Sequence, residues 1–173
     1  MKLEKFEKGL KLLSEDEYEE VHSSYPTIAQ TFSHICAVDV MWLQVLKGID
    51  MQEALEGSMA YAERAHLYSA DEFAASYEEL ASQFEEWMNS QTDVEQKMNL
   101  NNPWLGYRET AYSEILFHVA NHGTYHRGSI TTMLRQQGYA SAMNDLALYW
   151  LSGLVQRVLA KCITAEWSVE LLF

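Results

Sequence analysis

The sequence contains little cysteine, proline or glycine. Its two cysteines, Cys36 and Cys162, lie far apart in the chain and define no disulfide framework, so we expect two buried thiols in a reducing compartment. Two prolines and eight glycines are too few for a fibrous or disordered chain. We therefore expect residues 1–173 to form one globular domain with a core of its own.

Positive charge is also scarce. Twelve basic residues stand against 25 acidic residues, which gives a formal net charge of -13. A charge of this sign and size repels nucleic-acid phosphates and anionic lipid headgroups. We expect neither a nucleic-acid partner nor a membrane partner.

Long apolar runs are missing as well. Residues 1–8 mix charges of both signs where a secretory signal needs an uninterrupted apolar stretch. The most apolar stretch, residues 146–159, is interrupted by polar side chains and is shorter than the roughly 20 residues that a bilayer requires. We therefore expect a cytoplasmic protein.

Apolar side chains recur at helical spacing along most of the chain. The segments with this spacing are 3–13, 28–46, 51–59, 73–88, 112–134 and 145–161. Residues 89–108 are rich in polar and turn-forming residues, which predicts an irregular crossover connection. Because little β-strand signal remains, the sequence predicts an all-α fold, an antiparallel helical bundle.

Several residues mark where the predicted helices begin and end. Ser69 with Glu72 three residues later has the form of a capping box and predicts the start of the fourth segment. Thr110 is the expected N-cap of the fifth segment. Gly48 and Gly138 are expected to end two helices, because glycine readily adopts the left-handed conformation of a helix C-terminus.

Histidines carry the strongest chemical signal. His118, His122 and His126 follow one another at steps of four, which places them along one helix face where a metal ion could be their partner. His118 and His126 lie roughly 12 Å apart along the axis, too far to share one ion with Zn–N bonds of about 2.0–2.1 Å. The ligand pair is therefore 118/122 or 122/126, with His34 on a facing helix as the expected third ligand. A hydrogen-bonded core cluster is an equal alternative.

Two other sequence patterns are alternatives to this metal site. Glu19 with His22, and Glu63 with His66, have the Glu-x-x-His spacing of ferritin-like di-iron bundles, but both pairs lie beside loop-like segments. Zinc proteases carry glutamate directly after the first histidine of their His-Glu-x-x-His motif, where this chain has Gly123. The sequence therefore disfavours both a di-iron site and a protease.

Two segments resemble a known family. Residues 118–128, HVANHGTYHRG, are similar to the signature helix of the DinB/YfiT-like family of metalloproteins, and residues 34–43, HICAVDVMWL, are similar to its earlier ligand helix. The resemblance spans roughly residues 10–150 and implies a four-helix bundle in up-down-down-up order, here with an extra C-terminal helical segment. The ligands that it implies for a divalent metal ion are His34, His122 and His126. Zinc, nickel, iron and manganese all suit such ligands.

The resemblance also implies a function. Members of the family resemble thiol-dependent S-transferases and isomerases that use low-molecular-weight thiols such as bacillithiol or mycothiol. We therefore expect a metal-dependent enzyme, a thiol S-transferase or a hydrolase, that acts on a small molecule. A metal-binding protein without catalysis, whose ion has a structural or sensing role, is the alternative. A homodimer is also expected.

Some residues near the expected ligands are secondary candidates. Asp39, Asn121 and Tyr125 can orient an imidazole or hold a substrate, and packing roles are the simpler interpretation of each. Arg127 can pair with a substrate carboxylate or form a structural ion pair. The chain departs from the family in a short first helix, in Ser129 where glutamine is common, and in its continuation beyond Trp150. These departures concern the rim of the site and a dimer interface.

Overall fold

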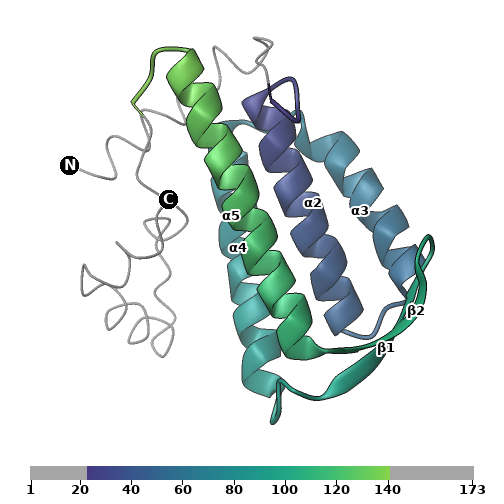
Figure 1. Ribbon diagram of the computed structural model, residues 1–173. Helices are drawn as coiled ribbons and strands as arrows, with labels where there is room; N and C mark the ends of the chain where they lie inside the picture. Colours follow the sequence, from purple (N-terminus) through teal and green to yellow (C-terminus); the bar gives the residue numbers. More distant parts are fainter. Residues whose placement is uncertain (1–22, 141–173) are drawn as a thin grey trace.

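The computed structural model describes residues 23–140 (Figure 1). Its elements in this range are α2 (Ile28–Leu46), α3 (Met51–Ala65), α4 (Ala70–Ser90), β1 (Lys97–Asn102), β2 (Gly106–Ala111) and α5 (Tyr112–Gln136). The mostly helical fold confirms the predicted all-α class. The predicted helices at 3–13 and 145–161, together with Cys162 and the Glu19/His22 pair, lie outside the described residues.

The helix ends follow from local side-chain chemistry. The capping box of α4 is present, because the Ser69 hydroxyl accepts from the Glu72 amide at 3.3 Å and the Glu72 carboxylate accepts from the Ser69 amide at 2.7 Å. Gly48 and Gly138 follow α2 and α5 with φ of 90° and 85°, a conformation that favours glycine. These three helix boundaries were predicted correctly.

Contacts between helix ends define how the chain runs. Ser33 near the start of α2 donates a hydrogen bond to the Ala62 carbonyl near the end of α3, so these helices are antiparallel. Trp87 near the end of α4 donates to the Leu46 carbonyl at the end of α2 at 3.0 Å, so α2 and α4 run the same way. Helix α3, which follows α2 in the chain, therefore runs back antiparallel to it, and α4 then runs parallel to α2.

Helix α5 runs opposite to α2 and α4, and in Figure 1 it lies beside α2 and in front of α4, with the hairpin at the end where α5 begins. The order of α2, α4 and α5 therefore matches the last three helices of an up-down-down-up bundle, with α3 as an additional connecting helix. The predicted helix at 3–13, which would be the first of that order, lies outside the described residues.

The core surrounds α2, which packs against α3, α4 and α5. The largest side chains with less than 2% exposure are Leu43, Ile115, Met133, Val45, Thr31 and Cys36. Burying each large aliphatic side chain contributes roughly 1.5–3 kcal/mol. This packing fixes the rotation of α2 and α5 about their axes and hence the direction of every side chain between them. None of the helices within residues 23–140 is long and apolar enough to cross a membrane.

The prediction of an irregular connection between α4 and α5 was wrong. Strands β1 and β2 pair antiparallel there, with Lys97 opposite Ala111 and Asn102 opposite Gly106. The Asn102 side chain accepts from two amides of the turn, and Gly106 has φ of 79°. Leu100 in β1 is buried in the core cluster at 8% exposure, and Thr110 and Ala111 are buried at the end of β2. These buried positions do not alternate with exposed ones, so the hairpin was not visible in the sequence.

Two smaller predictions also differ from the structure. Thr110 does not cap α5: it lies buried in β2, and the Glu114 carboxylate accepts from the amide of the actual N-cap, Ala111, at 2.9 Å. The predicted apolar face of α3 is narrower than expected. Met51 is buried, but Met59 is 60% exposed.

Candidate metal centre

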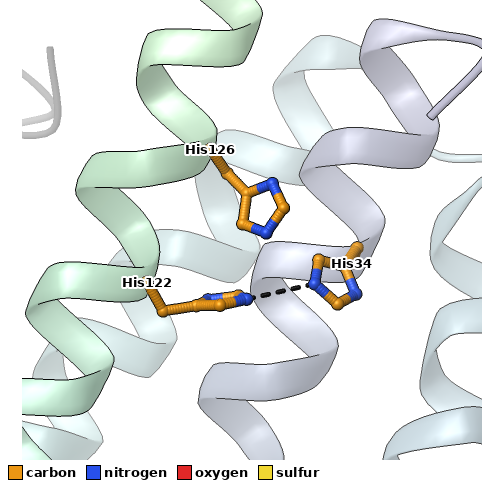
Figure 2. A group of neighbouring side chains, drawn as sticks. All are labelled: His34, His122 and His126. Atoms are coloured by element: carbon orange, nitrogen blue, oxygen red, sulfur yellow. Dashed lines mark hydrogen bonds between the residues drawn. The ribbon is translucent and has the colours of Figure 1, made fainter. Parts of the chain in front are cut away.

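Three histidines from two helices converge between α2 and α5 (Figure 2). His34 lies on α2, and His122 and His126 lie on α5. Their ligand nitrogens all lie within 4.8 Å of one another, and Nε2 of His34 is 3.0 Å from Nε2 of His122. Within residues 23–140, no other group of three metal-ligating side chains comes together in this way.

The arrangement follows from helix geometry and core packing. Four residues make slightly more than one helical turn, so His122 and His126 lie one above the other on α5. Ile115 and Ile130 on the same helix are buried in the core, which turns this face toward α2. Antiparallel packing then brings His34 opposite the pair, with His126 only 5% exposed.

Electrostatics keep the three imidazoles neutral. Burial, the largest cause, and the neighbouring histidines together lower the pKa of His122 to about 4. Burial also lowers the pKa of His34 and His126, and for His34 the charge of His126 adds to the effect. Neutral imidazole is the form that binds metal ions, since its unprotonated nitrogen carries a lone pair. The cluster is therefore ready to bind a cation at neutral pH.

The polar atoms of the cluster fit a divalent ion. Two nitrogens in tetrahedral zinc coordination lie roughly 3.4 Å apart when the Zn–N bonds are about 2.0–2.1 Å. The His34–His122 separation of 3.0 Å is already close to this value. A hydrogen-bonded core cluster, the alternative, needs partners for all its buried nitrogens. Within the described chain Nδ1 of His122 and of His126 are buried without a hydrogen bond, so hydrogen bonds do not satisfy all the nitrogens of the cluster.

The structure also places the remaining histidines. His118 is exposed and stacks on His122, with ring centroids 5.9 Å apart, but it does not belong to the group of three. Of the two pairs that helical spacing allowed, the structure therefore brings 122/126 together with His34. Glu63 and His66, the described half of the di-iron pattern, are both exposed and join no such group. The assignment of the three histidines as ligands stays a prediction.

The secondary candidates lie at different depths. Tyr125 is 63% exposed, and its ring meets His126 edge-on at 4.9 Å. Asn121 is exposed. Burial raises the pKa of Asp39 to about 7 although the charge of Arg127 lowers it, and one Asp39 oxygen is buried without a hydrogen bond. No hydrogen bond found in residues 23–140 joins Asp39 to the three histidines.

Gly123 has a packing reason of its own. A Cβ at this position would lie 2.7 Å from Nη1 of Arg127, so the absence of a side chain leaves room for the guanidinium. Arg127 is half-buried there and donates to the Thr124 hydroxyl at 2.9 Å. Gly123, which disfavours protease chemistry, therefore also leaves space for the Arg127 side chain to lie along α5.

Sequence reasoning missed Tyr25. Its ring lies 4.8 Å from the His34 ring and 5.9 Å from the His126 ring. Tyr25 precedes α2 and has no place in a helical pattern, so periodicity could not connect it to the site. The available signal was an aromatic residue directly before a proline at the start of the helix that carries His34.

Comparisons with known proteins agree with these features. The sequence model of the DinB family matches residues 3–155, a range that includes every described helix. Protein DinB of Bacillus subtilis (strain 168) is 35% identical to this chain over 132 residues, which cover 76% of this chain and 77% of that protein. No solved structure matches the chain significantly.

Proposed function

The chain belongs to the DinB family, and from this premise we propose that His34, His122 and His126 hold one divalent metal ion that activates a low-molecular-weight thiol for S-transfer. The observation that carries the proposal is the convergence of three neutral imidazoles from two helices on one point. The proposed partners are small molecules, a thiol and an electrophile.

The donor set supports Lewis-acid chemistry. Three protein ligands leave a coordination position open, and neutral imidazoles leave the charge of the cation uncompensated. A divalent ion held there favours the ionised form of a thiol or of water. The lowered pKa values of the three histidines mean that protons compete only weakly with the ion for their nitrogens at neutral pH.

Thiol transfer is proposed over hydrolysis for two reasons, the absence of a glutamate of the zinc-protease type and the acidity of thiols. Zinc hydrolases of the His-Glu-x-x-His type use a glutamate as general base to activate water, and glycine occupies that position here. A thiol is far more acidic than water and needs less help to ionise. In the transfer the thiol would release its proton to solvent, a sulfur–carbon bond would form to the electrophile, and the leaving group would depart with its bonding electrons.

Elemental analysis of the full chain, purified without chelator, tests the metal site. We expect about one zinc, nickel, iron or manganese ion per chain, or stoichiometric uptake when the metal-free protein is titrated, as one set of three ligands requires. Protein that contains no metal and takes none up would contradict the proposal. A screen with bacillithiol and a chromogenic electrophile, with metal-free protein as control, then tests transfer.

A structural ion is the second candidate, favoured by the position of the cluster between two helices. An ion held by residues of α2 and α5 joins the two helices and stabilises the folded state. Cobalt-substituted protein separates the two roles. If added thiol does not change the cobalt absorption spectrum while metal raises the melting temperature by several degrees, the role is structural.

The lowered histidine pKa values predict a weak pH dependence of metal affinity. Three ordinary imidazoles of pKa about 6.5 lose affinity roughly a thousandfold between about pH 7.5 and 5.5, since protons compete for each ligand. Here His122, with a pKa of about 4, stays unprotonated in this range. We expect a loss below about a hundredfold, measured by chelator competition at each pH. A thousandfold loss would show that the histidines titrate normally.

A further inference from the structure

The aromatic ring of Tyr25 contacts histidines on both helices of the candidate metal centre. It lies 4.8 Å from the His34 ring at an interplanar angle of 31° and 5.9 Å from the His126 ring at 53°. His34 belongs to α2 and His126 to α5. The ring therefore packs against one expected ligand from each helix.

The backbone holds Tyr25 in this position. Pro26 follows it, and a residue before proline is restricted to extended conformations. Thr27 then caps α2, because its hydroxyl accepts from the Gln30 amide at 3.1 Å. Tyr25 is thus tied to the start of the helix that carries His34, and its ring is placed before any ligand binds.

Tyr125 offers an instructive contrast. Among residues 23–140 the one ring that it contacts is that of His126, at 4.9 Å, and the side chain is 63% exposed. Tyr25 is half-buried, and its ring contacts one expected ligand on each of the two helices. Packing by the ring is therefore the contribution that the geometry supports.

We propose that Tyr25 is a positioning residue of the metal centre, whose ring holds His34 and His126 in the orientation that binds the ion. This inference rests on the metal binding proposed above. Residues that orient metal ligands without touching the metal typically change affinity about 10-fold to 100-fold when replaced. The ring acts through dispersion and ring–ring contacts with both imidazoles, so its loss frees two of the three ligands.

The test compares three Tyr25 variants of the full chain with one control variant. Tyr25→Phe keeps the ring and removes the hydroxyl, whereas Tyr25→Leu and Tyr25→Met keep apolar bulk and remove the ring. Tyr107→Ala, at a 67% exposed tyrosine on β2, is the control. The readouts are zinc affinity by chelator competition, the absorption spectrum of bound cobalt, and the melting temperature of the metal-free protein.

We expect Tyr25→Phe and Tyr107→Ala to bind zinc within about threefold of the unmodified protein, and the ring-free variants to bind at least about tenfold more weakly with an altered cobalt spectrum. Ring-free variants that bind within threefold overturn the inference, as does a Tyr25→Phe variant that binds as weakly as they do. If the unmodified chain takes up no metal, the proposed function itself fails. If it binds metal and the ring proves irrelevant, only the role of Tyr25 fails.

Discussion

Replacing His34 with alanine is expected to weaken zinc binding by roughly a thousandfold or more, because an ion with three protein ligands then keeps only two. His34 is also the one member of the cluster on α2, so the remaining pair lies on a single helix with no ligand opposite it. The affinity is measured by competition with a chromophoric chelator. Replacing His122 or His126 should have an effect of the same order.

Two other histidines provide controls for this experiment. His66 is exposed at the end of α3 and belongs to no ligand cluster, so His66→Ala should bind zinc like the unmodified protein. His118 stacks on His122 without joining the group, so His118→Ala should weaken binding by less than about tenfold. Unchanged affinity in His34→Ala would contradict the assignment of His34 as a ligand, and a loss of more than tenfold in His118→Ala would mean that the site uses the 118/122 pair instead.

Replacing Trp87 with alanine should destabilise the fold by about 3–5 kcal/mol, the usual range for a large aromatic residue removed from a core. Trp87 is 8% exposed, its indole donates to the Leu46 carbonyl at 3.0 Å, and its ring meets Tyr112 edge-on at 5.1 Å. One side chain therefore links the end of α4 to the end of α2 and the start of α5. Its removal leaves a cavity and a carbonyl without a partner.

Urea unfolding followed by circular dichroism measures this loss, with Trp104→Ala as the matched control. Trp104 is 72% exposed at the hairpin turn, so its removal should change the free energy of unfolding by no more than about 0.5 kcal/mol. Equal stabilities for the two variants would show that α4 adds little to the cooperative core. Both proteins are compared without metal, since a bound ion raises apparent stability.

Much of the helical architecture was predictable because it depends on neighbours in sequence. The Ser69–Glu72 capping box and the glycines at 48 and 138 act through residues within one turn, so the sequence alone predicts all three helix ends. The hairpin was not predictable, since its pairing depends on backbone hydrogen bonds between strands whose buried residues, Leu100, Thr110 and Ala111, form no alternating pattern. Backbone pairing leaves little trace in side-chain patterns.

The candidate site also has one part that the sequence predicts and one part that it leaves open. Helical spacing alone placed His122 and His126 on one face and excluded a site that joins His118 to His126. It could not choose between 118/122 and 122/126, because that choice depends on which turn of α5 faces His34. The register between two antiparallel helices is set by packing across the core, which involves residues distant in sequence.

The amino-acid sequence by itself determined the all-α class, the helix caps and the residue types able to bind a metal, because each of these depends on local spacing and side-chain chemistry. Only the tertiary structure decided that His34 meets His122 and His126, that burial keeps all three neutral, and that Tyr25 packs on two of them. These features arise only when segments that are far apart in the chain pack against one another and remove water from the space between them. The physical reason is that desolvation and convergence exist only after the helices have packed.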